Sequence, residues 1–359
     1  MLEVARFSIP YFQYLDEAGQ ALGALPAFAQ DKLTLLKLYR LMTLLRTFDA
    51  KAIALQRTGK LGTYPSVLGQ EAISVGLGHV MQADDVLCPA YREYGAQIQR
   101  GVTLSDILLY WGGDERGNAF QHPGDFPMSV PIGSQTLHAA GVAYAFKYRQ
   151  QARVAVSVCG DGATSQGDFY EALNVAGAWR LPVVFIVANN QWAISVSREK
   201  QTACQTLAQK AIAGGFEGWQ IDGNDIIAVQ EKMAEAIEKA RKGGGPTLIE
   251  AITYRLSDHT TADDASRYRQ KSAVEAAQAK EPLVRFRRYL MDKGWWSEAE
   301  EKTLLSTCAQ EVEAAVAAYQ AATPVTCDMM FDYHFANLPL DLQEQKALAA
   351  QFPVGVAHG

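Results

Sequence analysis

Apolar residues recur at helical spacing over a long segment near the start of the chain. Between residue 31 and about residue 57, one side of a helix would carry Leu33, Leu36, Leu38, Leu41, Leu45 and Phe48. Asp31 can cap the first turn of this helix, and Gly59 can end it. Residues 1–30, which include Pro10 and Pro26, predict an irregular N-terminal arm before the helix.

The middle of the chain alternates between short apolar runs and helical segments. The predicted strands are 153–159, 182–188, 218–222 and 246–255. The predicted helices between them are 165–179, 205–213 and 225–242. Strands that alternate with helices indicate an α/β fold, with a mainly parallel sheet and helices on both faces. After about residue 272 the chain is helical and charged, so we predict one domain over 31–359 with a helical C-terminal extension.

Composition and charge exclude several classes of protein. Apolar residues make up 48% of the chain and the net charge is −6, which is ordinary for a globular protein and argues against nucleic-acid binding. The five cysteines form no C-x-x-C pair, which argues against a cysteine zinc site. No apolar run approaches the roughly 20 residues of a membrane span, and no secretory signal opens the chain. We expect a soluble protein of the cytosol that binds neither nucleic acid nor membrane.

Polar residues follow two of the predicted strands at the point where each strand ends. Gly160-Asp161-Gly162 follows the first, and Asn189-Asn190 follows the next. Ligands of open parallel sheets bind outside the carboxyl ends of the strands, so Asp161 and Asn190 are expected to face one crevice. Their oxygens, with a carbonyl such as that of Trp192, suit Mg²⁺ holding a diphosphate. A nicotinamide-binding turn fits less well, because the third glycine of its motif is missing.

The segment GDGATSQGDFYEALNVAGAWRLPVVFIVANNQWAIS at 160–195 resembles the thiamine diphosphate motif of 2-oxo acid dehydrogenase alpha subunits. The resemblance is closest to the bacterial pyruvate type and covers nearly the whole chain. It takes in RTFD at 46–49, GQEA at 69–72, YRE at 91–93, IDGND at 221–225 and HTTADDASRYR at 259–269. It implies a thiamine diphosphate-binding fold with thiamine diphosphate and Mg²⁺ as cofactors.

The resemblance also assigns site residues. Tyr91 and Arg92 would grip the diphosphate, and Arg92 suits this task because its planar fork pairs with phosphate oxygens. Backbone groups of the segment 130–133 would contact the aminopyrimidine ring of the cofactor. The Ile132 side chain would lie under the cofactor and support its bent shape. The implied cofactor-binding residues are Tyr91, Arg92, Val130, Ile132, Gly160, Asp161, Gly162, Ala163, Asn190 and His259, and the implied metal ligands are Asp161, Asn190 and Trp192.

His259 is the candidate catalytic residue. The resemblance makes it a hydrogen-bonding group near the diphosphate that assists acyl transfer to a lipoyl group, and histidine can carry protons near neutral pH. On the residues alone, a histidine of a surface loop without a role remains an equal alternative. Arg255, Arg267 and Tyr268 are weaker candidates for supporting its loop.

The catalytic carboxylate that thiamine chemistry needs is not evident in the chain. Glu71 is a candidate, but the resemblance implies that this glutamate comes from a separate beta subunit. The implied partners are that beta subunit, in a heterotetramer (α₂β₂), and a lipoyl-bearing acyltransferase. Ala188 and the Tyr64-Pro65-Ser66 segment favour pyruvate over a branched-chain 2-oxo acid. Branched-chain and acetoin dehydrogenase alpha subunits stay open as alternatives, as does a paralogue that binds cofactor without turnover. Thr260 stands where eukaryotic relatives carry a regulatory phosphoserine.

Overall fold

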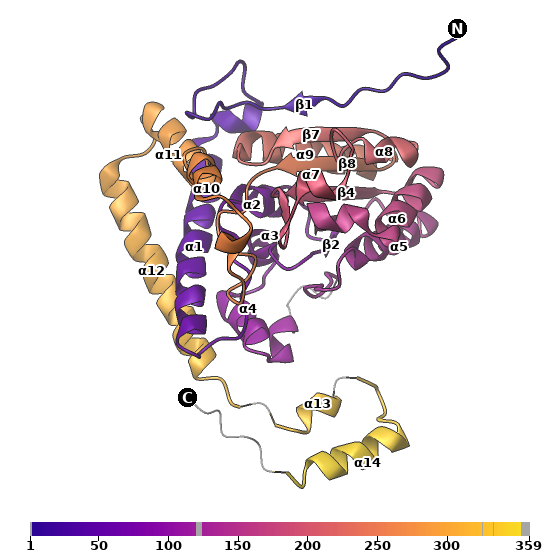
Figure 1. The fold of residues 1–359 in the computed structure, drawn as a ribbon, viewed down its shortest axis with the longest axis vertical. Helices are drawn as coiled ribbons and strands as arrows, with labels where there is room; N and C mark the ends of the chain where they lie inside the picture. The colour runs from indigo at the N-terminus through magenta and orange to yellow at the C-terminus, as the bar shows by residue number, and fades with distance from the viewer. Residues whose placement is uncertain (1, 120–123, 325, 333, 353–359) are drawn as a thin grey trace.

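A parallel β-sheet forms the centre of the molecule in the computed structural model, which describes residues 2–119, 124–324, 326–332 and 334–352 (Figure 1). The six strands have the order β1-β7-β8-β4-β3-β2, and every neighbouring pair is parallel. Their bounds are β1 Tyr11–Phe12, β2 Val86–Cys88, β3 Ala155–Gly160, β4 Val183–Asn189, β7 Gly218–Asp222 and β8 Thr247–Ile252. A short antiparallel pair, β5 Trp192–Ala193 and β6 Val196–Ser197, follows β4. The predicted parallel sheet is confirmed.

Helices cover both faces of this sheet. Alternate residues of each strand point to opposite faces, so β4 sends Phe185 to one hydrophobic cluster and Ile186 to the other. The first face is covered by α5 Ser134–Tyr148, α6 Gly167–Ala178 and α8 Lys210–Ala213. The second is covered by α2 Glu71–Val80, α3 Tyr94–Gln99 and α9 Ile226–Arg241. Burial on both faces explains why the strands read as continuous apolar runs.

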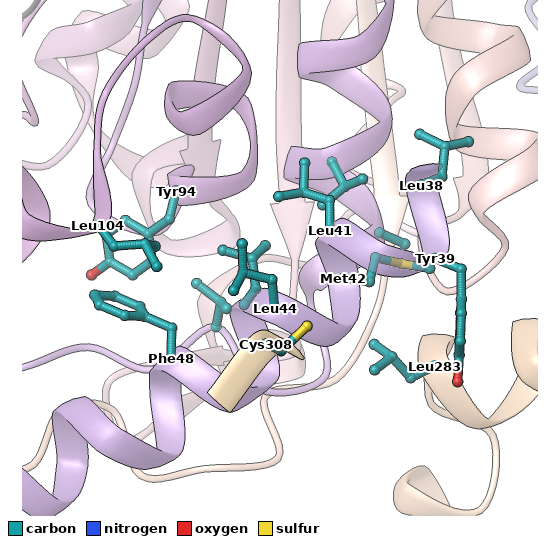
Figure 2. Close-up of a cluster of buried hydrophobic side chains, with 14 of the residues drawn as sticks. Leu38, Tyr39, Leu41, Met42, Leu44, Phe48, Tyr94, Leu104, Leu283 and Cys308 are labelled. Carbon is teal, nitrogen blue, oxygen red and sulfur yellow. The ribbon is translucent and has the colours of Figure 1, made fainter. Parts of the chain in front are cut away.

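A separate cluster of apolar side chains joins the first long helix to the C-terminal helices (Figure 2). Helix α1, Lys32–Arg57, is capped by Asp31, whose side chain accepts from the Leu33 amide at 3.0 Å. It packs beside α12, Glu298–Gln320, as Figure 1 shows, and contacts α11, Pro282–Asp292. Leu33, which the pattern grouped with the other apolar residues, is 69% exposed, whereas Leu35 of the same turn is fully buried. The remaining helices are α4 Leu104–Trp111, α7 Arg198–Gln201, α10 Lys271–Gln278, α13 Met329–Asp332 and α14 Leu340–Ala349, with 3-10 turns at Ala27–Gln30, Glu115–Asn118, Asp161–Ser165 and Ala265–Arg267.

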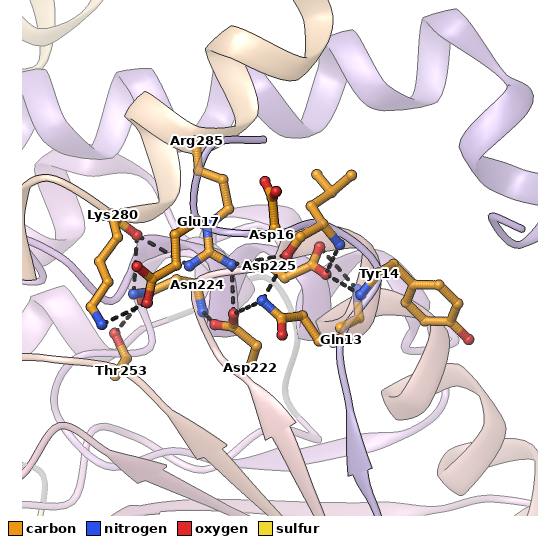
Figure 3. A network of polar contacts seen from close by, with 12 residues as sticks. Gln13, Tyr14, Asp16, Glu17, Asp222, Asn224, Asp225, Thr253, Lys280 and Arg285 are labelled. Atoms are coloured by element: carbon orange, nitrogen blue, oxygen red, sulfur yellow. Dashed lines mark hydrogen bonds and ion pairs between the residues drawn. The ribbon is translucent and has the colours of Figure 1, made fainter. Parts of the chain in front are cut away.

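The N-terminal arm is attached to the sheet by polar contacts (Figure 3). Strand β1 pairs with β7, which the sequence pattern did not predict. The Asp225 carboxylate, at the start of α9, accepts the backbone amides of Tyr14 and Leu15 at 2.6 and 2.7 Å. Arg285 of α11 pairs with Asp222 at 2.5 Å. The arm therefore follows a fixed path across the sheet edge. Among the described residues, no helix is both long and apolar enough to cross a bilayer.

Two predicted elements are shorter than the sequence pattern indicated. The helix predicted at 205–213 comprises only α8, because the Leu207 and Ala208 amides donate to the buried Glu250 carboxylate instead. The strand predicted at 246–255 ends at Ile252. Beyond it, Thr253 and Arg255 donate backbone hydrogen bonds to the carbonyls of Asn189 and Asn190, at 2.9 and 3.2 Å. This pairing brings residues 253–255 beside the polar segment after β4.

Candidate cofactor site

A cavity of about 200 Å³ lies at the carboxyl ends of β3 and β4. Of the residues predicted from the strand ends, Gly160, Asp161, Gly162, Ala163 and Asn190 line it. Of the other predicted residues, Tyr91, Arg92, Ile132, Trp192 and His259 line it too. Val130 does not: it is 49% exposed and lies outside the cavity wall. The parallel register, which sets Gly160 opposite Ala188, brings the two polar segments together.

Asp161 begins a 3-10 turn directly after β3 and carries an unpaired buried oxygen. The residue is 2% exposed, and its Oδ2 atom has no hydrogen-bond partner among the described residues. Burial raises the pKa of this carboxyl to about 6, although the Arg255 and Arg92 guanidinium groups act in the opposite direction. A buried carboxylate oxygen without a partner is unfavourable unless a cation or donor satisfies it. The oxygens of Asp161 and Asn190 therefore fit a hard cation.

Two glycines shape the turn that carries Asp161. A methyl group on Gly160 would meet nothing within 4 Å, so the glycine keeps this part of the wall open. A methyl group on Gly162 would lie 2.7 Å from the Ala193 side chain, so the glycine allows the turn to pack against β5. Gly160 therefore leaves room for a ligand beside the backbone, and Gly162 permits close packing of the turn.

A buried lysine that the sequence interpretation missed supports the same turn. Lys210 of α8 is 4% exposed and donates to the Thr164 carbonyl at 2.6 Å and to its hydroxyl at 3.0 Å. Its ammonium also lies 5.0 Å from the centre of the Tyr170 ring. The one hint in the sequence was a charged residue within the apolar segment LAQKAIA. Lys210 thus places a positive charge behind the turn that carries Asp161.

Two arginines give the site further positive charge. Arg92 donates to the Ser66 carbonyl at 2.9 Å and to the His259 carbonyl. Arg255, which is fully buried, donates to the Ile194 carbonyl and the Tyr268 hydroxyl, both at 2.8 Å. In the described part of the chain neither guanidinium forms an ion pair with a carboxylate. Arg92, which lines the cavity, therefore remains available to an anion, whereas the fully buried Arg255 is not part of the cavity wall.

His259 is oriented by the same two arginines. Its Nδ1 atom lies 3.5 Å from an Arg92 nitrogen and 3.4 Å from an Arg255 nitrogen. Guanidinium nitrogens only donate, so Nδ1 accepts and Nε2 carries the proton. Burial, reinforced by both arginines, lowers the pKa of His259 to about 4. The lowered pKa favours a neutral imidazole near pH 7, with Nε2–H as its donor.

The loop around His259 is held by two of the three candidates named from the sequence. Asp263 accepts the His259 amide at 2.9 Å and also the Tyr268 hydroxyl. Arg255 in turn contacts both Tyr268 and the His259 ring. Arg267 instead points to solvent and pairs with Asp264 at 3.2 Å, so it does not support the loop.

Two buried glutamates lie near the site but differ in access to it. Glu71 is outside the cavity wall, where it pairs with Arg46 at 2.6 Å and accepts the Gly69 amide at 3.0 Å. Glu93 lines the cavity, and burial raises its pKa to about 7. The sequence interpretation did not single out Glu93, because nothing local indicates that a carboxylate after Tyr91-Arg92 is buried.

A parallel α/β sheet whose carboxyl edge carries a cavity lined by Arg92 and by a carboxylate with an unpaired oxygen is suited to an anionic cofactor held together with a cation. The sequence model of the dehydrogenase E1 component family matches residues 39–326. The chain belongs to this family of oxidoreductases, whose members depend on thiamine diphosphate.

Individual relatives are similar over most of their length. The pyruvate dehydrogenase E1 component subunit alpha of Bacillus subtilis is 40% identical over 346 residues, 95% of this chain and 92% of the relative. The protein of the same name from Mycoplasma genitalium is 40% identical over 315 residues, 88% of each chain. The 3-methyl-2-oxobutanoate dehydrogenase subunit alpha of Mycobacterium tuberculosis is 42% identical over 314 residues, 87% of this chain and 86% of the relative.

Proposed function

We propose that this chain is the alpha subunit of a cytosolic pyruvate dehydrogenase, which decarboxylates pyruvate oxidatively and passes the acetyl group to a lipoyl carrier. Support comes from relatives named for pyruvate that align over most of the chain. Ala188 before the Asn189-Asn190 pair and the Tyr64-Pro65-Ser66 segment point the same way. A branched-chain 2-oxo acid is the second candidate, because the 42% identical relative from Mycobacterium tuberculosis carries that name.

The observation that carries the cofactor assignment is the unpaired Asp161 Oδ2 in a cavity that Arg92 lines without a carboxylate partner. In this proposal Mg²⁺ is held by the Asp161 carboxylate, the Asn190 amide oxygen and the Trp192 carbonyl. Arg92 and Tyr91 bind the diphosphate, and the backbone of the Gly160–Ala163 turn lies against it. Bound thiamine diphosphate supplies the nucleophilic carbon and the electron sink for decarboxylation.

His259 is proposed to act through its protonated Nε2. Arg92 and Arg255 occupy the Nδ1 side of the ring, so the Nε2–H is the only ring donor left for a ligand. A neutral donor can stabilise a developing oxyanion without first releasing a proton. Exchanging His259 for alanine should therefore leave cofactor binding largely intact and impair acylation of the lipoyl group.

We propose a beta subunit as the partner that completes the site, in a heterotetramer (α₂β₂), with a lipoyl-bearing acyltransferase as the acceptor. Two apolar residues of the cavity rim support a covering partner, since Ile132 is 47% and Ile194 is 56% exposed. The carboxylate that acts at the aminopyrimidine is proposed to come from that subunit.

A substrate panel tests this function. The chain is co-expressed with its beta subunit, supplied with thiamine diphosphate and Mg²⁺, and assayed with an artificial electron acceptor. Pyruvate should be preferred over 3-methyl-2-oxobutanoate and acetoin. Preference for another substrate would move the assignment within the family, and a stable cofactor-loaded complex without turnover would favour a non-catalytic paralogue.

A further inference from the structure

Gln70 is a cavity residue to which no role has been given so far. It immediately precedes α2, is 5% exposed and lines the cavity beside Asn190. Its Oε1 atom accepts a hydrogen bond from the Asn190 Nδ2 atom at 3.0 Å. Its Nε2 atom is buried and has no partner among the described residues.

Backbone chemistry fixes which way these two amides point. The Trp192 amide lies 3.2 Å from the Asn190 side chain and can only donate, so the atom that faces it is Asn190 Oδ1. Asn190 Nδ2 must then face Gln70, which has to present Oε1 to it. The remaining Gln70 atom is consequently Nε2, a donor. Reversing either amide would oppose two donors or two acceptors, so the orientation is set.

The backbone under Gln70 holds this arrangement in place. The Gln70 amide donates to the Val67 carbonyl at 2.8 Å, and the Thr253 hydroxyl donates to the Gly69 carbonyl at 2.5 Å. Gly69 has φ +88°, and a methyl group there would lie 2.6 Å from the Tyr254 carbonyl oxygen. The Gln70 side chain therefore starts from a tightly packed turn, with its free donor at the cavity wall.

We propose that Gln70 is a positioning and binding residue: it orients the Asn190 amide toward the cation and donates its Nε2–H to an acceptor atom of the bound cofactor. The inference rests on the proposed function, since it assumes that Asn190 is a metal ligand. Buried donors in native proteins are nearly always paired, so a ligand acceptor explains why this one is not. An amide that is locked before binding also loses less freedom when the ligand arrives.

The test compares Gln70→Met with Gln97→Met in the complex with the beta subunit. Gln97, of α3, is a matched control: it is 2% exposed, both of its side-chain amide atoms lack partners, and it does not line the cavity. Calorimetry would measure thiamine diphosphate binding at saturating Mg²⁺, and Mg²⁺ binding at fixed cofactor. Thermal unfolding of each complex, without and with cofactor and Mg²⁺, separates a loss of stability from a loss of binding.

We expect Gln70→Met to weaken both binding reactions about tenfold or more, the usual effect of losing a hydrogen bond to a charged ligand. The cofactor-free Gln70→Met complex should unfold somewhat below the wild type, because the buried Asn190 Nδ2 loses its acceptor. Cofactor and Mg²⁺ should then raise its unfolding temperature less than that of the Gln97→Met complex, whose binding should match the wild type. Gln70→Ala, which adds no bulk, serves if the methionine variant does not assemble. Wild-type affinity in the Gln70 variant would overturn the inference, as would an equal rise in unfolding temperature on adding cofactor and Mg²⁺. If the wild-type complex itself binds no thiamine diphosphate, the proposed function fails rather than the role of Gln70.

Discussion

Replacing Asp161 with asparagine should increase the stability of the cofactor-free protein while removing its metal-dependent binding. Burial raises the pKa of this carboxyl to about 6 from an ordinary value of 3.8. A difference of about 2 units, at about 1.36 kcal/mol per unit, amounts to a destabilisation of at most about 3 kcal/mol from the ionised group. The folded chain binds this proton more tightly than the unfolded chain does. The destabilisation is therefore absent below about pH 3.8 and complete above about pH 6.

Thermal unfolding of the complex with the beta subunit at pH 7.5, with and without Mg²⁺ and thiamine diphosphate, measures both effects. Without ligand, Asp161→Asn should unfold at a higher temperature than the wild type. With ligand at about one hundred times its dissociation constant, the wild type should gain about 2.7 kcal/mol and the variant almost nothing. Asp168→Asn, at an exposed position in the first turn of α6, is the control and should behave like the wild type. A variant less stable than the wild type without ligand, or one that gains equally from ligand, would refute the reasoning.

Three further predictions follow from other contacts. Gly162→Ala places a methyl group 2.7 Å from the Ala193 side chain, so the turn must shift. Calorimetry should show weaker cofactor binding, and the free energy of unfolding should fall by about 1–3 kcal/mol. Burial and two arginines hold the pKa of His259 near 4, below its ordinary 6.5, so the folded chain binds this proton less tightly than the unfolded chain does. The stability that depends on the neutral imidazole is therefore present above about pH 6.5 and lost as the pH falls through 4. An NMR titration in which His259 changes charge near pH 6.5 would contradict this. Arg285→Met leaves the buried Asp222 without its ionic partner, so chemical denaturation should show a free energy of unfolding lower by about 3–5 kcal/mol. Limited proteolysis should then cut the N-terminal arm. An arm as resistant to protease as in the wild type would argue against the contact.

The elements predicted best from the sequence were those whose pattern is local. The long helix α1 was predicted within a residue, because its apolar spacing and the Asp31 cap are both local features. Strand β7 was predicted at its observed bounds for the same reason. Strands β1 and β2, by contrast, are only two and three residues long, too short for any pattern to identify. The helix predicted at 205–213 was shortened by Glu250, which lies more than 40 residues away in the chain.

The candidate site divides in the same way. That Asp161 and Asn190 lie together could be predicted, since consecutive parallel strands joined by one helix end at the same edge. The burial of Lys210, Glu93 and Gln70 could not be predicted, because each is surrounded by segments distant in sequence.

The sequence by itself determined the parallel α/β class, the family, and the polar residues that end β3 and β4. Those features depend on periodicity and on motifs within a few residues of one another. Only the tertiary structure decided the chemical state of the site: the raised pKa of Asp161, the neutral His259 with its proton on Nε2, and the free donor of Gln70. The pKa values and the amide orientation depend on desolvation and on single hydrogen bonds between atoms that the fold alone brings within about 3 Å.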